Sequence, residues 1–231
     1  MCCPTSATGT NFGRVKVITI PGVEEYAAAH TTADPDHLLD LAAETRARCE
    51  RPHMMIGPVE ARFLQFFLLT LQPKRVLEVG TFTGYSSLSM IEVLPPDAEI
   101  TTCEISQEHA DIARKHIAAA GYGDRISVRV GPALETVSTL TGPYDFVLLD
   151  ADQRHFPEYL DLVLPLLSED GVVVADNVLW SGAVLDPEDN EPATEGIRRF
   201  NDTVVARPDL VCVLASVRDG MMFIRRKKAT R

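Results

Sequence analysis

The amino-acid sequence predicts an α/β fold in which one mostly parallel sheet has helices on both faces. From residue 75 onward, short apolar runs alternate with longer segments of helical periodicity, a pattern typical of parallel β-α units. A glycine turn follows the first apolar run, as at the start of nucleotide-binding α/β domains. The last two apolar runs are joined by little more than Arg218-Asp-Gly220. A connection that short makes a hairpin, so the final strand is predicted to be antiparallel.

The elements of the predicted core follow from these runs and their flanking residues. Each apolar run of strand length ends at a turn residue or an acid, and each helical segment begins shortly afterwards. Predicted strands cover 75–80, 99–105, 126–130, 144–150, 171–177, 210–217 and 221–226, and predicted helices cover 85–94, 106–120, 132–140, 156–168 and 192–206.

The N-terminal third of the chain precedes this alternation. Prolines divide residues 21–73 into three predicted helices, which need a surface to pack on. We expect them to form a cap on the sheet instead of a separate domain. The predicted organisation is therefore a flexible arm at 1–20 and one domain at 21–231, made of the cap and an α/β core at 74–231.

The stretch 75–87 carries the first chemical signal, because it joins a buried strand, a glycine turn and a helix start. Gly80 lets a ligand approach the backbone where a Cβ would block it. The spacing Gly-x-x-x-Gly differs from that of dinucleotide binders, and the adjacent Glu78 would repel a pyrophosphate. Glu104 ends the next strand, where an acid typically binds ribose hydroxyls. Glu78 instead suits a ligand with a positive charge. A ligand that has a ribose and a positive centre but no pyrophosphate is S-adenosylmethionine. The alternative is an ordinary turn with surface acids.

A second cluster of polar side chains follows two later strands. Asp150 ends the strand at 144–150, and Asp176 and Asn177 end the strand at 171–177. The carboxyl ends of parallel strands meet at one edge of a sheet, where ligands bind. Two carboxylates and an amide oxygen suit Mg²⁺, Mn²⁺ or Ca²⁺. The alternative is that these acids cap the following helices.

Composition and charge limit the classes of partner. The chain of 231 residues is 45% hydrophobic and 24% charged, as is ordinary for a soluble globular protein. Its net charge of −11 disfavours nucleic acid, because phosphate binding needs a basic surface. No apolar run reaches about 18 residues, and no secretory signal is visible, so we expect no membrane partner. Five cysteines without a Cys-x-x-Cys pair fit free thiols in a reducing cytoplasm.

Four segments form a distinctive set: Glu78-Val-Gly-Thr-Phe-Thr-Gly-Tyr-Ser86, Gly131-Pro-Ala-Leu-Glu135, Asp150-Ala-Asp152 and Asp176-Asn-Val-Leu-Trp-Ser-Gly182. Together they resemble the cation-dependent O-methyltransferases, which include caffeoyl-coenzyme A and catechol O-methyltransferases and many small bacterial relatives. Met54-Met-Ile-Gly-Pro58 is similar to the segment with which that family closes over its cofactor. The resemblance runs from about Val23 to Arg226 and so covers nearly the whole chain.

The resemblance implies a class I methyltransferase fold, a Rossmann-like seven-stranded sheet with an antiparallel last strand. It also implies bound S-adenosylmethionine, a divalent cation, a small hydroxylated acceptor and a homodimer. By position in the family's motifs, the cofactor would contact Ile56, Glu78, Gly80, Thr81, Ser86, Glu104, Ala133 and Asp152. The cation would be held by Asp150, Asp176 and Asn177, and the acceptor pocket would be lined by Trp180 and Asp219.

The chain departs from the family after the fourth strand. The family reads Asp-Ala-Asp-Lys-x-Asn-Tyr there, and its lysine is taken to remove the acceptor proton. Here Gln153 stands in place of the lysine, His155 of the asparagine and Phe156 of the tyrosine. An amide does not accept a proton, so the predicted catalytic set is Asp150 beside the cation, Gln153 and, as candidate base, His155. The alternative is that His155 lies on the outside of its helix.

The leading hypothesis is a metal-dependent O-methyltransferase acting on a small hydroxylated acceptor such as a catechol or another natural product. One alternative is an enzyme that methylates hydroxyuridine in tRNA, against which the acidic balance speaks. The other is a non-catalytic cofactor-binding protein, which Gln153 would suit. The sequence leaves the identity of the acceptor open.

Overall fold

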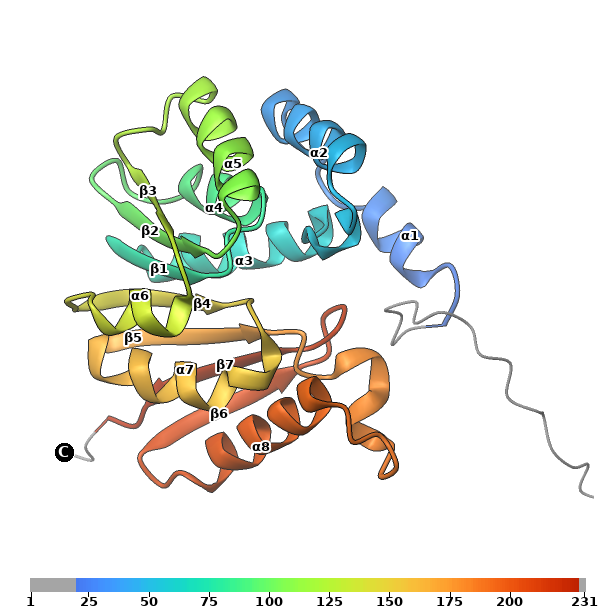
Figure 1. Cartoon of the computed structure of the whole chain (residues 1–231), viewed down its shortest axis with the longest axis vertical. Coiled ribbons are helices and arrows are strands. Elements are labelled where there is room, and N and C mark those ends of the chain that lie inside the picture. Colours follow the sequence, from blue (N-terminus) through green and yellow to red (C-terminus); the bar gives the residue numbers. More distant parts are fainter. Residues whose placement is uncertain (1–19, 229–231) are drawn as a thin grey trace, which may run out of the picture.

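The protein folds around one seven-stranded sheet, as shown by a computed structural model that describes residues 20–228 (Figure 1). The strand order is β3-β2-β1-β4-β5-β7-β6, and β7 is antiparallel to both neighbours while the other pairs are parallel. The predicted fold class and the antiparallel last strand are thus confirmed. The predicted arm falls, but for its last residue, outside the described residues. The strands are β1 (Arg75–Val79), β2 (Glu99–Glu104), β3 (Ile126–Val130), β4 (Tyr144–Leu149), β5 (Leu167–Asp176), β6 (Leu210–Ala215) and β7 (Met221–Arg226).

Helices cover both faces of this sheet. One apolar cluster joins the sheet to α2, α3, α4 and α5, and a second joins its other face to α6, α7 and α8 (Figure 1). Neighbouring residues of β1 show the division, since Val76 packs in the first cluster and Leu77 in the second. Burial on both faces explains why the strands are continuous apolar runs. The helices are α1 (Val23–Ala29), α2 (Asp36–Arg48), α3 (Pro58–Leu71), α4 (Tyr85–Ile91), α5 (Gln107–Ala119), α6 (Ala133–Ser138), α7 (Phe156–Val163) and α8 (Pro192–Ala206).

The boundary between α7 and β5 differs from the predicted one. The sequence predicts a helix to residue 168 and a strand from 171, whereas α7 ends at Val163 and β5 begins at Leu167. Pro165 explains the difference, because proline has no N–H to donate to a continuing helix. A short 3₁₀ turn, η3 (Leu164–Leu166), fills the gap. Three further 3₁₀ turns that the sequence did not indicate are η1 (Pro52–Met54), η2 (Gln153–His155) and η4 (Trp180–Leu185).

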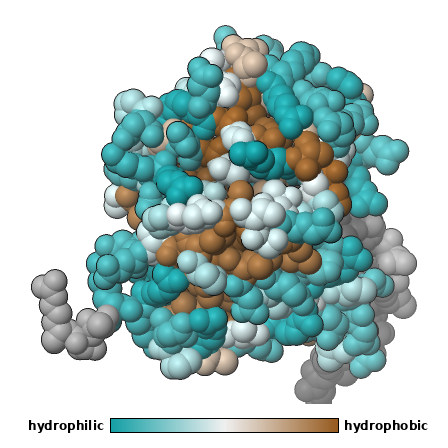
Figure 2. Space-filling model, turned by 60° about the vertical axis from the view of Figure 1, so that its left-hand side comes forward, coloured by the Kyte–Doolittle hydropathy of each residue, from teal (hydrophilic) through white to brown (hydrophobic). Residues whose placement is uncertain are grey.

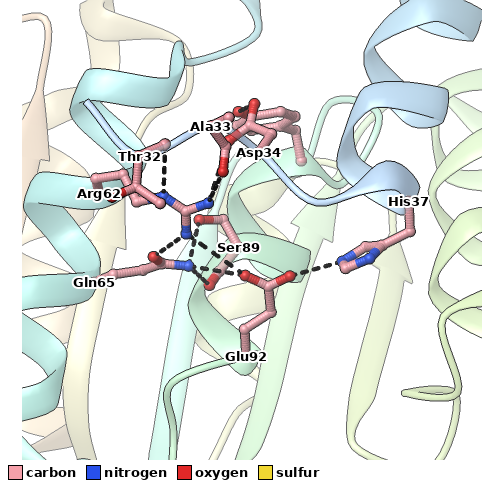
Figure 3. Close-up of polar contacts among 9 residues, drawn as sticks. Thr32, Ala33, Asp34, His37, Arg62, Gln65, Ser89 and Glu92 are labelled. Atoms are coloured by element: carbon pink, nitrogen blue, oxygen red, sulfur yellow. Dashed lines mark hydrogen bonds and ion pairs between the residues drawn. The ribbon is translucent and has the colours of Figure 1, made fainter. Parts of the chain in front are cut away.

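Arg62 of α3 attaches the segment between α1 and α2 to the rest of the cap (Figure 3). Its guanidinium donates hydrogen bonds to the backbone oxygens of Thr32 and Ala33, at 3.3 and 2.9 Å. On its other side it donates to Gln65, whose amide nitrogen donates to Glu92 at 3.1 Å. Glu92 directly follows α4, so this network ties the cap to the helix that starts at the glycine turn.

Residues Pro52–Leu71 form a helical segment that by length and composition alone is apolar enough to cross a membrane. The core helix of a soluble protein passes the same test. Here Leu64 and Leu68 are fully buried in the first apolar cluster, and Arg62 makes the contacts just described. Only 33% of its apolar window is buried, and Phe66 and Leu69 are 74% and 50% exposed, so the absence of a membrane partner stays a prediction.

Candidate active site

The turn after β1 lies directly against the end of β4. Gly80 has a φ of 109°, and a Cβ on it would lie 1.9 Å from the backbone oxygen of Asp150. Any other residue would therefore push the two strand ends apart. The backbone N–H groups of Gly80 and Thr81 both donate to the oxygen of Cys103, each at 3.1 Å. The turn is thus held between β2 and β4 and forms one wall of the cavity described below.

Glu104 lies at the carboxyl end of β2, as predicted, and is held from two sides. Its Oε2 accepts a hydrogen bond from the backbone N–H of Phe82 at 2.7 Å, and its Oε1 accepts one from Ser106 at 2.9 Å. The Nδ1 of His109 lies 3.5 Å from Oε1. These contacts fix the carboxylate beside the glycine turn, and the side chain is only 7% exposed.

A cavity of about 450 Å³ opens over these strand ends. Its walls come from η1 and the segment after it, the glycine turn, the ends of β2 and β4, the start of α6, and the segments after β4 and β5. Most of the predicted site residues line it: Ile56, Gly80, Thr81, Ser86, Glu104, Ala133, Asp150, Asp152, Gln153, Asn177 and Trp180. Four predicted site residues do not: Glu78, His155, Asp176 and Asp219.

Glu78 is fully buried beneath the glycine turn and faces α4 instead of the cavity. Its carboxylate accepts hydrogen bonds from the hydroxyls of Ser86 and Ser87, and from Thr102 at 2.6 Å. Burial raises the pKa of this carboxyl, and the three hydroxyl donors counter part of that effect. Only Ser86 of this group lines the cavity, so the cofactor contact that the resemblance implied for Glu78 would run through that serine.

Asp150, Asp176 and Asn177 meet at the ends of β4 and β5, as the strand-end argument predicts. Asn177 links the two acids, because its backbone N–H donates to Asp176 Oδ1 at 2.7 Å and its side-chain nitrogen donates to Asp150 Oδ1 at 3.0 Å. Asn177 itself has a φ of 64°, in the left-handed region that asparagine tolerates better than most residues. The three residues that the sequence predicted to lie close together therefore do so, and their role as cation ligands stays a prediction.

Glu60, from the first turn of α3, is a third acid in this cluster, and it was not predicted from the sequence. It is 3% exposed. Burial raises its pKa well above the ordinary value, and the nearby carboxylates of Asp176 and Asp150 raise it further. Arg218, in the turn between β6 and β7, opposes this effect with an ion pair at 2.9 Å. The acids thus come from both the cap and the sheet, and they share one arginine.

This set of oxygen atoms matches a hard divalent cation in residue type. Carboxylate and amide oxygens are the ligands that Mg²⁺ and Ca²⁺ prefer, and crowded like charges favour a bound cation. Two facts speak against a finished site. Asn177 turns its amide nitrogen, not its oxygen, toward Asp150. Within residues 20–228, no three His, Cys, Asp or Glu side chains are arranged to hold a metal ion. A half-turn of the Asn177 amide would be required.

The segment after β4 separates the two residues that the sequence offered for proton transfer. Gln153 lines the cavity. His155 does not, and its Nδ1 instead lies 3.3 Å from Asp152 Oδ2, while its ring meets that of Tyr159 edge-on at 6.3 Å. The hydrogen bond from Arg154 lowers the pKa of the Asp152 carboxyl. The placement of His155 follows the exterior alternative, and it gives no support to His155 as the base.

Comparison with known proteins then decides the family. A family model described as O-methyltransferase matches residues 28–227. The chain belongs to this O-methyltransferase family. A catechol O-methyltransferase from Niastella koreensis is 34% identical to it over 208 residues, which cover 86% of this chain and 94% of that enzyme.

Solved structures agree with the sequence match. A methyltransferase from Podospora anserina, solved with bound SAH, has a TM-score of 0.84 at 28% identity and covers 97% of this chain and 100% of its own. An O-methyltransferase from Bacillus cereus, in complex with SAH, has a TM-score of 0.83 at 30% identity and covers 89% of this chain and 97% of its own. The resemblance drawn from the sequence motifs and the class I methyltransferase fold are both confirmed.

In this O-methyltransferase the segment after β5 is held by its neighbours in space. Asp219 accepts a hydrogen bond from the backbone N–H of Leu179 at 2.9 Å on its backbone oxygen and one from Ser181 on its carboxylate. Arg198 of α8 donates to the backbone oxygens of η4 and the segment after it, including Val184 at 3.1 Å and Asp189 at 2.8 Å. These contacts hold Trp180 at the cavity. Asp219 does not line this cavity and instead holds the backbone on either side of Trp180.

Several lining residues of this O-methyltransferase carried no signal in the sequence. Phe82 and His109 line the cavity with their rings 4.7 Å apart, edge to face. His53 and Met55 enter from the cap, and Tyr159 enters from α7. Phe82 sits inside the glycine motif and was findable there. The others depend on how the cap, α5 and α7 pack, which no local pattern reports.

Proposed function

We propose that this protein transfers the methyl group of S-adenosylmethionine to a hydroxyl oxygen of a small, catechol-like acceptor, with a divalent cation held beside the cofactor. The observation that carries the proposal is that one cavity is lined by Glu104 and also by Asp150 and Asn177. Glu104, which is placed to bind a ribose, therefore faces the same space as Asp150 and Asn177, whose oxygen atoms suit a cation. The SAH-bound relatives and the catechol O-methyltransferase relative support the choice of ligands.

The cofactor would lie across the ends of β1 and β2. Glu104, already oriented by two backbone donors, would accept hydrogen bonds from the ribose hydroxyls. Phe82 and His109 offer aromatic surface for the adenine ring. Ile56, 7% exposed, would cover the cofactor from the cap. Each contact comes from a different element, so the fold itself must be formed before the cofactor binds.

Asp150, Asp176 and Asn177 would hold the cation, with Mg²⁺ as the first choice and Mn²⁺ or Ca²⁺ as alternatives. A bound cation would lower the pKa of the acceptor hydroxyl and stabilise its oxyanion. The chain's own residues would then orient that oxygen in line behind the methyl group, at about 3 Å. Trp180 lines the cavity and would pack against the acceptor ring, while Asp219 supports the segment that carries Trp180.

Turnover of catechol with S-adenosylmethionine tests this function directly. We expect EDTA to stop methylation and added Mg²⁺ or Mn²⁺ to restore it. Asp176→Ala should lose cation-dependent turnover and keep SAH binding. Asp170→Ala, at the exposed part of the same strand, should keep both the cation-dependent turnover and SAH binding and serves as the control. Activity that survives chelation unchanged would show that the strand-end acids are structural.

A second candidate is a protein that binds the cofactor without turnover. Gln153 favours it, because this residue lines the cavity and does not accept a proton. Methylation of any acceptor by the purified protein rejects it.

We further propose that the protein is a cytoplasmic homodimer. The free thiols of Cys49, Cys103 and Cys212 support a reducing compartment. β6 is an edge strand, and its Val211 and Val213 are 48% and 60% exposed. An edge strand with exposed apolar side chains is a surface on which a second copy can pack. Figure 2 shows one face of the molecule, on which two groups of hydrophobic residues are separated by a band of intermediate and hydrophilic ones. Sedimentation of the wild type as a dimer and of a Val213→Lys variant as a monomer would support this proposal.

A further inference from the structure

Helix α8 contributes no residue to the lining of the active-site cavity within residues 20–228, yet it contacts both segments that carry the acceptor-side residues. One segment is η2, which begins at Gln153, and the other is η4, which begins at Trp180. Both of these residues line the cavity, and we call the part that they line the acceptor end. In Figure 1, α8 lies beside the orange segment that follows β5. The position of α8 therefore bears on the shape of the acceptor end.

Gly196 is the point at which α8 meets η2. A Cβ on this glycine would lie 2.4 Å from the backbone oxygen of Gln153 and 2.7 Å from the Cα of Arg154. Ordinary contacts of a Cβ begin at 3.4 Å, so η2 would have to move by about 1 Å. Both neighbours are backbone atoms, which do not move aside by a change of rotamer as a side chain does. Glycine also weakens a helix relative to alanine, so the close approach to η2 explains a glycine inside α8.

Arg198 of α8 holds the second segment. It lies two residues after Gly196, and residues at this spacing do not share a face of a helix. Its guanidinium donates hydrogen bonds to four backbone oxygens of η4 and the segment after it. These oxygens belong to Ala183 at 3.0 Å, Val184 at 3.1 Å, Asp186 and Asp189 at 2.8 Å. The segment that carries Trp180 is therefore fixed to the same helix as η2.

The buried side of α8 keeps the helix itself in place. Ile197 and Phe200 are fully buried in the second apolar cluster. The ring of Phe200 meets that of Phe156, which directly follows η2, edge-on at 5.4 Å. Gln153 contacts Gly196 and also lines the cavity, whereas Gly196 does not line it. A displacement of η2 away from α8 therefore moves Gln153 into the cavity.

We propose that α8 sets the width of the acceptor end and that Gly196 is the specificity-determining position in this helix. Because this residue has no side chain, η2 lies directly on α8, and the space in front of Gln153 stays open. Arg198 fixes the part of the acceptor end that Trp180 forms. The inference rests on the proposed methyl transfer to a catechol-like hydroxyl, and it adds the residues that decide how wide an acceptor ring can bind.

Calorimetric binding of two diols to the full-length protein, with SAH and Mg²⁺ present, tests this inference. The diols are catechol and a naphthalene diol, which carries the same pair of adjacent hydroxyls on a wider ring system. Gly196→Ala should raise the ratio of Kd for the naphthalene diol to Kd for catechol by about tenfold, because overfilling a packed site has a cost of this size. Gly123→Ala is the matched control, since a Cβ there meets no atom within 4 Å, and it should leave the ratio unchanged.

A double-variant cycle with Gln153→Ala separates positioning from packing. Truncation of Gln153 gives the displaced segment room, so in that background Gly196→Ala should change the ratio of the two Kd values by less than about threefold. An effect of Gly196→Ala that is the same with and without the Gln153 side chain would mean that Gly196 has only a packing role. Helix propensity alone would raise the melting temperature of Gly196→Ala, whereas the contact with η2 should lower it. A raised melting temperature therefore overturns the proposed contact.

Arg198→Ala keeps the inference testable if Gly196→Ala does not fold, because the Arg198 side chain is partly exposed, at 23%. This variant frees the segment that carries Trp180. Catechol should then bind about tenfold more weakly and the naphthalene diol should lose less, so that the ratio falls by about threefold. Arg199→Ala, on the exposed side of α8, should leave the ratio unchanged.

The outcomes for this inference and for the proposed function are distinct. If catechol is bound and methylated but the ratio is unchanged in a folded Gly196→Ala protein or in Arg198→Ala, α8 does not set the width, and the proposed function stands. If the wild type neither binds nor methylates either diol, the proposed function fails and this inference fails with it.

Discussion

Glu104 offers the most direct test of the cofactor site, because its geometry separates a ligand contact from a structural one. The carboxylate accepts hydrogen bonds from the backbone N–H groups of Phe82 and Ser106 in the protein itself. In the proposed complex it would also accept bonds from the two ribose hydroxyls. Glu104→Ala removes all four, and Glu104→Gln keeps one oxygen while it removes the charge.

The expected loss of affinity follows from the energies of these bonds. A hydrogen bond to a charged group contributes roughly 1.5–3 kcal/mol. Loss of the ribose contacts, partly replaced by water, should cost about 2 kcal/mol, which is about thirtyfold in Kd. Glu104→Ala also leaves two backbone donors without their acceptor, at about 1 kcal/mol each, so the variant should unfold at lower temperature as well.

Calorimetry with SAH and thermal unfolding separate the two effects. Glu104→Gln should bind SAH about tenfold more weakly, with a smaller change in melting temperature than the alanine variant shows. Glu99→Gln, at the exposed start of the same strand, should change neither quantity. Unchanged SAH affinity in a folded Glu104→Ala protein would refute the ribose role and leave Glu104 as a support for the turn.

Three further predictions concern other parts of the molecule. Gln153→Lys should preserve or raise the steady-state turnover of catechol at neutral pH, because it adds a proton acceptor at the cavity; a collapse on every acceptor, with SAH and Mg²⁺ still bound, would contradict this. Arg198→Ala should raise KM for the acceptor about tenfold and leave SAH affinity intact, because it frees the segment after Trp180, whereas Arg199→Ala should not. Hydrogen bonds, the largest from Lys115, lower the pKa of Glu44 to about 2. The contribution of ionised Glu44 to the stability of the folded protein is present above the ordinary carboxyl pKa and is lost as pH falls toward 2. The melting temperatures of wild type and Glu44→Gln should therefore differ at pH 7 and converge in acid.

The strand ends of the site were predictable because burial imposes a visible pattern. β4 and β5 are buried on both faces toward their carboxyl ends, so their apolar runs stop at the edge of the sheet, at Asp150 directly after β4 and at Asp176, the last residue of β5. Glu78 lies inside its strand, and there the alternation of faces decides its role. Val76 packs on the α4 side of the sheet, and Glu78, two residues on, points to the same side. The resemblance alone did not show that its carboxylate would be enclosed by hydroxyls.

The cap residues of the site were not predictable from local pattern. Glu60 reads as an ordinary acid in the first turn of a helix, where its charge suits the helix dipole. Its role depends on Arg218, which lies 158 residues away in the sequence and reaches it from a hairpin turn. His155 shows the converse limit. The spacing between His155 and Gln153 in the sequence lets the His155 ring lie on either side of the short 3₁₀ turn η2. Only its contact with Asp152 shows on which side the ring lies.

The acids at the sheet edge also explain why the cap belongs to the active site and is not only a cover. Glu60, Asp150 and Asp176 are close enough for each of the two aspartates to raise the pKa of Glu60. Such repulsion is relieved by a proton, by an arginine or by a cation. Arg218 supplies part of the relief and holds α3 to the hairpin turn in doing so. A cation bound by the two aspartates would supply more. Whatever binds at the sheet edge therefore changes the energy of the contact that positions the cap, and by linkage the position of the cap changes the affinity at the sheet edge.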